Sequence, residues 1–172
     1  MIFLLSGPVH SGKTTLLKRA VREFKDQGVR VDGFLSEAVF TGKEKTGYDL
    51  LDLREDRSLP LLRIAGEEEW QRIGSYFFVP SGIEKAEKII LRSGGADICI
   101  VDEVGPLELE GRGFWPALER VFLPPSTNFL IVVRETILEG FLNVLGKTDV
   151  MVFDMKERDI FSQLIQEVMR AV

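Results

Sequence analysis

A glycine-rich loop near the N-terminus does most to limit the folds open to this chain of 172 residues. It follows an apolar run at 2–6 and precedes apolar residues repeated at helical spacing, so a strand, a turn and a helix are predicted in this order. The loop matches G-x-x-x-x-G-K-[ST] and reads Gly7-Pro8-Val9-His10-Ser11-Gly12-Lys13-Thr14-Thr15.

The chemistry of phosphate binding explains these residue types. Glycines let backbone N–H groups turn inward around an anion, and the positive end of the following helix points at the same place. Lys13 is expected to place its charge on the β and γ oxygens of a nucleotide, and the Thr14 hydroxyl is expected to bind Mg²⁺. His10 is expected to act through its backbone, and the alternative is a side-chain contact with the γ-phosphate or a lid. Residues 7–15 are therefore predicted to be nucleotide-binding.

Two adjacent acids follow a second apolar run, at 98–101. This run predicts a buried strand whose carboxyl end lies on the ligand-binding side of an open α/β sheet. A P-loop requires a carboxylate at this place, so Asp102 is predicted to bind Mg²⁺ and Glu103 to orient the attacking water. Neighbours on a regular strand point in opposite directions, so the two acids are not expected to share the ion. Lys13, Asp102 and Glu103 are the predicted catalytic residues.

The run Asp102-Glu103-Val104-Gly105 also matches the D-x-x-G pattern of small GTPases, and Gly105 is included in the predicted nucleotide site. Those proteins read the base with N-K-x-D directly after a strand. Here residues 134–137 read R-E-T-I after the predicted strand at 129–133, and the partial match G-K-T-D at 146–149 precedes a strand. Because the sequence offers no base reader, broad base tolerance is expected.

Strand-like apolar runs alternate with helical repeats along the chain. This alternation predicts an α/β fold with a mainly parallel sheet. Together with the glycine-rich loop, it predicts the three-layer α/β/α sandwich of P-loop NTPases. Ser81 and Glu84 form an S-x-x-E pattern, which predicts a capping box at a helix start. With no linker or repeat in the sequence, residues 1–172 are predicted to form a single domain.

One region departs from this alternation, between residues 37 and 64. It contains short strand-like pieces at 38–41, 48–53 and 61–64, with a polar turn after the first. Such pieces predict an antiparallel hairpin insertion at the edge of the sheet.

Composition limits the partners of the chain. Asp and Glu number 27 against 22 Lys and Arg, a formal charge of −5, so broad nucleic-acid binding is disfavoured. Cys99 is the single cysteine, which fits a reducing compartment, and no apolar stretch approaches the roughly 20 residues that span a membrane. We expect a cytoplasmic protein with no membrane partner. The sequence identifies no protein partner and is compatible with a monomer.

Several patches taken together resemble the THEP-type nucleoside-triphosphatases, a family of small P-loop NTPases that includes the cancer-related nucleoside-triphosphatase of animals. The run D-E-[IV]-G-x-[ML]-E-L is the most specific element. The patches are GPVHSGKTT at 7–15, VDGFLSEAV at 31–39, GYDLLDL at 47–53, ICIVDEVGPLEL at 98–109 and DVMVFDMKERD at 149–159.

The resemblance implies a P-loop α/β fold and Mg²⁺-dependent hydrolysis of ATP, GTP, CTP and other nucleoside triphosphates to the diphosphate. It also implies that Asp102 and Glu103 match the acidic pair at a strand end in that family. Glu108 falls in the same motif and is a candidate support for the site, although a helix-start acid is an equal alternative. Glu37, in the G-F-x-x-E patch, is a similar candidate.

The sequence offers two candidates for an arginine finger and allows two alternative functions. Arg134, just past a predicted strand, is a candidate finger that would stabilise transition-state charge, and Arg112 is the other option. The first alternative function is a small-molecule or nucleoside kinase on the same scaffold, although no segment with clustered arginines suggests a lid. The second is a slow nucleotide-gated switch that acts through a partner.

Overall fold

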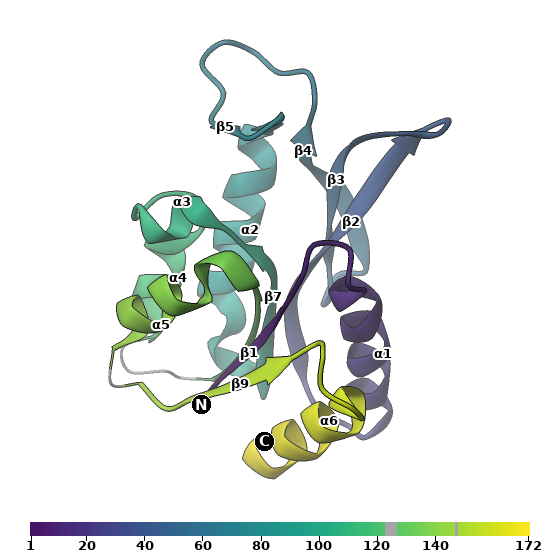
Figure 1. The fold of residues 1–172 in the computed structure, drawn as a ribbon, viewed down its shortest axis with the longest axis vertical. Coiled ribbons are helices and arrows are strands. Elements are labelled where there is room, and N and C mark those ends of the chain that lie inside the picture. Colours follow the sequence, from purple (N-terminus) through teal and green to yellow (C-terminus); the bar gives the residue numbers. More distant parts are fainter. Residues whose placement is uncertain (123–126, 147) are drawn as a thin grey trace.

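The computed structural model describes residues 1–122, 127–146 and 148–172, so Lys147 of the partial base-reader pattern lies outside the described residues. Within the described residues the strands form one nine-stranded sheet, in the order β5-β6-β4-β3-β2-β7-β8-β1-β9 (Figure 1). None of the helices in this part of the chain is long and apolar enough to cross a lipid bilayer.

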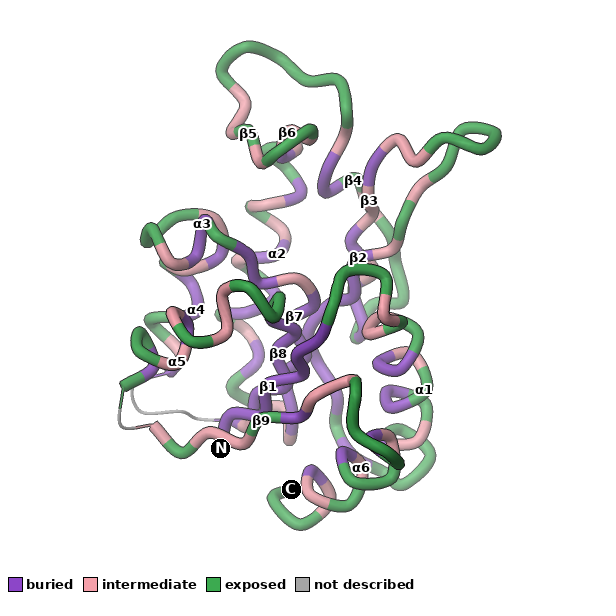
Figure 2. The backbone as a smooth tube through the Cα atoms, in the orientation of Figure 1, coloured by how far each residue is buried: buried purple, intermediate pink, exposed green. Residues whose placement is uncertain are grey.

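Parallel strands make up the centre of this sheet and one edge. They pair in the order β2-β7-β8-β1-β9, every neighbour parallel. β1 and the middle of β7 and β8 are buried on both faces (Figure 2), as their continuous apolar runs predict. These five strands are β1 (Ile2–Gly7), β2 (Val31–Thr41), β7 (Ile98–Val104), β8 (Asn128–Arg134) and β9 (Val150–Asp154).

Helices cover both faces of the sheet, which confirms the predicted three layers. On one face α1 (Lys13–Asp26) and α6 (Ile160–Ala171) bury their apolar stripes against the sheet. On the other face lie α2 (Pro80–Arg92), α4 (Trp115–Phe122) and α5 (Leu138–Leu145), as Figure 1 shows. The phosphate loop joins β1 to α1 at the carboxyl end of the parallel strands, where ligands bind in such sheets.

Antiparallel strands extend the sheet beyond β2, and the predicted hairpin material belongs to this extension. Its strands are β3 (Glu44–Asp52), β4 (Arg57–Arg63), β5 (Arg72–Ile73) and β6 (Tyr76–Phe78). The extension is therefore larger than the sequence predicted, because β5 and β6 also belong to it.

The piece predicted as a separate strand at 38–41 is the second half of β2. This long strand pairs in parallel with β7 over Val31–Phe34 and antiparallel with β3 over Phe34–Thr41. It thereby connects the parallel half of the sheet to the antiparallel half without a turn.

The predicted capping box at Ser81 and Glu84 is wrong. Helix α2 begins with Pro80 at its first position after Val79, and no side chain caps it. Proline suits this position because its fixed φ matches the helix and its missing N–H would lack a partner there anyway. Glu84 instead pairs with Lys88 one turn later, at 2.6 Å.

A buried ion cluster fastens α2 to β2 and β3. Arg92 of α2 donates to Asp52 at 2.6 Å and to Asp32 at 3.0 Å, and Lys85 lies 3.0 Å from Asp52. Asp32 and Asp52 are both buried. Burial alone would raise the pKa of Asp52, but the hydrogen bonds from Arg92 and Lys85 bring that pKa below its usual value.

Replacing Arg92 tests this cluster. Arg92→Met leaves two buried carboxylates without their main partner, so we expect the free energy of unfolding to fall by about 3 kcal/mol at pH 7. A carboxylate with a lowered folded-state pKa stabilises above its unfolded pKa, near 3.8, and loses this contribution as the pH falls through the folded value. Denaturant titration should therefore show the difference narrowing below about pH 4.

Lys88→Met is the matched control, because it removes an exposed partner on the same helix and should leave stability near the wild-type value. An Arg92→Met loss no larger than that of the control would contradict the assignment.

Candidate functional site

The loop between β1 and α1 forms a cradle, and the Lys13 side chain folds back onto this loop. His10 and Gly12 have left-handed φ angles of 63° and 87°, and Gly12 directly precedes α1. The Lys13 ammonium donates to the carbonyls of Gly7 at 2.9 Å and Pro8 at 2.7 Å. Burial lowers the pKa of Lys13, with the charges of Glu103 and Asp102 opposing this shift. A bound phosphate would give the ammonium a stronger partner than these carbonyls.

A hydrogen bond joins this loop to the end of β7. The Thr14 hydroxyl donates to Asp102 Oδ2 at 2.9 Å, and the backbone N–H of Ser36 donates to the same oxygen at 3.1 Å. The structure thus brings together the two residues that were predicted to bind the metal.

The second oxygen of Asp102 fits a cation. Asp102 is completely buried, and its Oδ1 has no hydrogen-bond partner among the described residues. Burial, together with the nearby Glu103 carboxylate, raises the pKa of Asp102 to about 7. A divalent ion beside this oxygen would satisfy it and favour the ionised form.

The protein atoms alone do not complete a metal site. Within the described ranges, no three His, Cys, Asp or Glu side chains gather around one point. This fits an ion of the kind that binds one or two protein ligands and takes the rest from water and phosphate.

Glu103 lies in a bulge that the sequence analysis did not foresee. The register of β7 against β8 shifts between Val101 and Val104, and Glu103 adopts a left-handed φ of 70°. This conformation costs a non-glycine residue about 1–3 kcal/mol, and such strain concentrates at functional sites. Burial raises the pKa of Glu103, while the charges of Arg134, Lys45 and Lys13 oppose this. β7 thus continues past both acids, to Val104, but not as the regular strand on which their opposite orientations were conditional.

Glu108 holds the loop after β7. This side chain is buried, and it accepts hydrogen bonds from the backbone N–H groups of Gly105 at 2.7 Å and Phe114 at 3.0 Å. Burial raises its pKa, which these two hydrogen bonds oppose. It is the third residue of the short helix α3 (Pro106–Leu109) and binds the N–H of Gly105, the residue just before this helix. Its two hydrogen bonds thereby connect Gly105 with Phe114 across the segment that follows β7.

Of the other candidate residues, Glu37 and Arg134 line the cavity at the phosphate loop, and Arg112 does not. Glu37 pairs with Lys18 of α1 at 2.5 Å and borders the phosphate loop. Arg134, at the end of β8, lines the same cavity as the phosphate loop and Glu103, and its charge acts on both Lys13 and Glu103. Arg112 is exposed and pairs with Glu110 at 3.2 Å.

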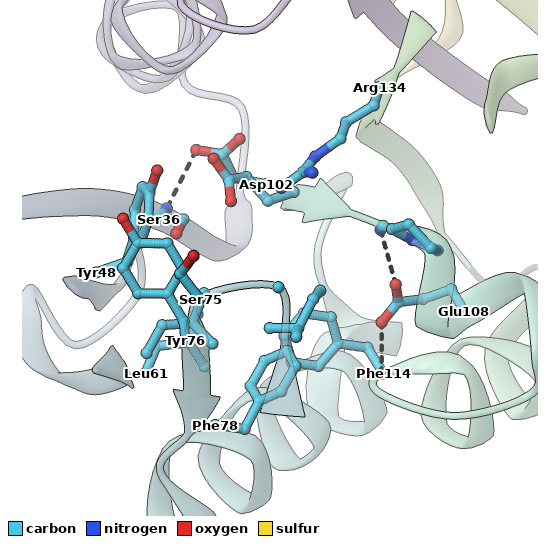
Figure 3. Close-up of a pocket in the computed structure, with 16 residues that line it drawn as sticks. Ser36, Tyr48, Leu61, Ser75, Tyr76, Phe78, Asp102, Glu108, Phe114 and Arg134 are labelled. Carbon is cyan, nitrogen blue, oxygen red and sulfur yellow. Dashed lines mark hydrogen bonds between the residues drawn. The ribbon is translucent and has the colours of Figure 1, made fainter. Parts of the chain in front are cut away.

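Two cavities meet at the acidic pair. The loop cavity, about 550 Å³, is lined by residues 9–15 of the phosphate loop. The aromatic cavity, about 380 Å³, lies between Asp102 and the rings of Tyr76, Phe78 and Phe114 (Figure 3). The residues that line both cavities are Ser36, Tyr48, Glu103 and Arg134.

Sequence reasoning missed Ser36 and Tyr48 at this junction. Both fall within patches that resemble the NTPase family, VDGFLSEAV and GYDLLDL. No chemical pattern marks them, because a lone serine and a lone tyrosine in strands have many possible roles. Ser36 reaches the acidic pair because β2 pairs with β7, and Tyr48 does so because β3 pairs with β2.

The structural role of Glu108 can be measured. Glu108→Ala leaves two buried N–H groups without an acceptor, so we expect the free energy of unfolding to fall by about 2–5 kcal/mol. Glu108→Gln keeps one acceptor oxygen and should lose about half as much. Denaturant titration measures both, with the exposed Glu110→Ala as control. If the free energy of unfolding of Glu108→Ala equals that of the control, Glu108 does not hold this loop.

The fold and the cradle define a P-loop nucleotide-binding protein of the α/β class. The protein family described as NTPase matches residues 2–169. The chain therefore belongs to the NTPase family, and the resemblance found in the sequence is confirmed.

Named relatives agree with this assignment. The chain is 36% identical to the cancer-related nucleoside-triphosphatase homolog of Bos taurus, over 72% of this chain and 70% of the relative. It is 34% identical to the cancer-related nucleoside-triphosphatase of Homo sapiens, over 73% and 71%. It is 28% identical to the nucleoside-triphosphatase THEP1 of Pyrococcus abyssi, over 100% of this chain and 94% of that protein.

Solved structures show the same fold. The solution structure of a human cancer-related nucleoside triphosphatase superposes with a TM-score of 0.74 at 28% identity, and covers 98% of this chain and 95% of its own. The crystal structure of THEP1 from Aquifex aeolicus superposes with a TM-score of 0.76 at 20% identity, over 98% and 99%. The second comparison concerns the fold alone.

Proposed function

We propose that this protein hydrolyses nucleoside triphosphates to the diphosphate and phosphate, with Mg²⁺, and that it accepts several bases. The observation that carries the proposal is the 2.9 Å hydrogen bond from Thr14 to the buried Asp102. It joins the first turn of α1 to a carboxylate whose other oxygen has no partner among the described residues, which is the arrangement that a P-loop needs for its metal.

The loop backbone, Lys13 and the Thr14–Asp102 pair would each bind a different part of the nucleotide–metal complex. Backbone N–H groups of the loop and of the first turn of α1 surround the phosphates. Lys13 exchanges the carbonyls of Gly7 and Pro8 for the β and γ oxygens. Thr14 and Asp102 would hold Mg²⁺, which when bound neutralises charge on the transferring phosphoryl group.

Glu103 is the residue that would orient water. Its carboxylate lies where the two cavities meet, one residue beyond the metal carboxylate. There it can accept a hydrogen bond from a water in line with the γ-phosphate and direct the oxygen at phosphorus. Arg134 lines the same junction, and its guanidinium can stabilise the charge that develops on the γ oxygens.

Broad base selection has separate support. The names of the similar proteins specify a nucleoside-triphosphatase and no particular base. The interactions inferred above are made with phosphates and metal, which every nucleoside triphosphate shares.

The proposal also includes the cellular location, domain organisation and partners of the protein. We infer a cytoplasmic, single-domain protein over residues 1–172, without a nucleic-acid partner. The continuous sheet supports one domain, the buried thiol of Cys99 fits a reducing compartment, and the charge of −5 disfavours broad nucleic-acid binding.

A phosphate-release assay tests the activity. ATP, GTP, CTP and UTP are each incubated with the protein, with Mg²⁺ and with EDTA. We expect phosphate from all four with Mg²⁺ and none with EDTA. Release from only one nucleotide would overturn the broad specificity, and equal release in EDTA would overturn the metal requirement.

Glu103→Gln tests the role of the water-orienting residue. The amide keeps the shape but is a far weaker proton acceptor, so we expect kcat to fall by about 10²–10⁴-fold. Binding of a non-hydrolysable ATP analogue, measured by calorimetry, should change little. The exposed Glu110→Gln is the control and should turn over normally. Unchanged turnover by Glu103→Gln would remove Glu103 from the mechanism.

A further inference from the structure

The aromatic cavity has the walls of a small-molecule site. Tyr48 and Tyr76 meet edge to face with ring centroids 5.5 Å apart, and Phe78 and Phe114 do so at 5.8 Å. Leu61 completes the apolar wall. The volume of the aromatic cavity, about 380 Å³, lies in the range of sites for small ligands. A flat ring is the shape that such side chains hold best.

One end of this cavity is polar. Figure 3 shows Asp102 and Arg134 on the opposite side from Tyr76 and Phe78. Ser36 lines the same end, and its hydroxyl is buried without a hydrogen-bond partner among the described residues. A buried hydroxyl without a partner is costly, and a polar group of a ligand would satisfy it. The binding steps proposed for the nucleotide do not use this hydroxyl.

The polar end faces the reactive end of a bound nucleotide. Lys13 and Thr14 mark the β and γ phosphates, and Thr14 contacts Asp102 directly. Glu103 follows Asp102 and lines both cavities. A molecule in the aromatic cavity therefore approaches the γ-phosphate from the side where water would attack.

We propose that the aromatic cavity is an acceptor site, and that the protein transfers the γ-phosphoryl group to the hydroxyl of a small alcohol with a flat ring, of nucleoside size or smaller. The ring packs among Tyr48, Tyr76, Phe78 and Phe114, and the hydroxyl lies beside Glu103 and Ser36. This inference rests on the proposed nucleotide site, since that site supplies the phosphoryl group.

The transfer balances without another reactant. The alcohol oxygen forms a bond to the γ-phosphorus, and the bond from this phosphorus to the β–γ bridging oxygen breaks. The nucleoside diphosphate leaves with that electron pair, and the hydroxyl proton passes to the Glu103 carboxylate. With the cavity filled by water, the same geometry yields hydrolysis.

The test follows labelled phosphate from [γ-³²P]ATP in the presence of uridine, adenosine or pyridoxine, each an alcohol with a flat ring. Chromatography separates labelled acceptor from inorganic phosphate. Ser75→Trp places a large ring at the exposed rim of the cavity, and Ser58→Trp makes the same change at an exposed position on β4, away from both cavities.

We expect label on at least one probe, and a ratio of labelled probe to phosphate that falls about 100-fold in Ser75→Trp but not in Ser58→Trp. Hydrolysis of ATP with no label on any probe would overturn the acceptor site and leave the proposed hydrolase intact. If Ser75→Trp weakens ATP binding without a probe, the cavity holds the nucleobase and the inference is wrong. No phosphate release from ATP by the wild type would overturn both proposals.

Discussion

The hydrogen bond between Thr14 and Asp102 joins the two halves of the site, and the functional geometry depends on it. Thr14 lies in the first turn of α1, and Asp102 lies near the carboxyl end of β7, two positions away from β1 in the sheet. A buried carboxylate is unfavourable when one of its oxygens has no partner, as is the case for Asp102 Oδ1 among the described residues. In the proposed function a cation beside this oxygen offsets the cost of its desolvation.

The antiparallel extension explains why this P-loop protein has a second cavity. β2 passes from parallel pairing with β7 to antiparallel pairing with β3, and this carries Ser36 and Tyr48 over the end of β7. The bulge lies at Glu103, the residue that lines both cavities. The ion cluster around Arg92 fixes α2 against this extension. Stability and site geometry therefore depend on the same strands.

The fold class and the loop could be predicted from the sequence because their signals are local. Gly12 and Lys13 stand in a pattern that only a phosphate loop requires, and the apolar run before Asp102 marks a buried strand by itself. The bulge could not be predicted, since glutamate carries no preference for a left-handed φ. The aromatic cavity could not be predicted either, because its rings come from β3, from β6 and from Phe114 just before α4, which only the tertiary fold brings together.

The most direct measurement is a crystal structure with a non-hydrolysable ATP analogue and Mn²⁺, located by its anomalous signal. The account predicts manganese in contact with the Thr14 hydroxyl and beside Asp102, with Lys13 moved from the carbonyls of Gly7 and Pro8 to the β and γ phosphates. Phosphates bound elsewhere, with Lys13 still on those carbonyls and no manganese near Thr14, would contradict it.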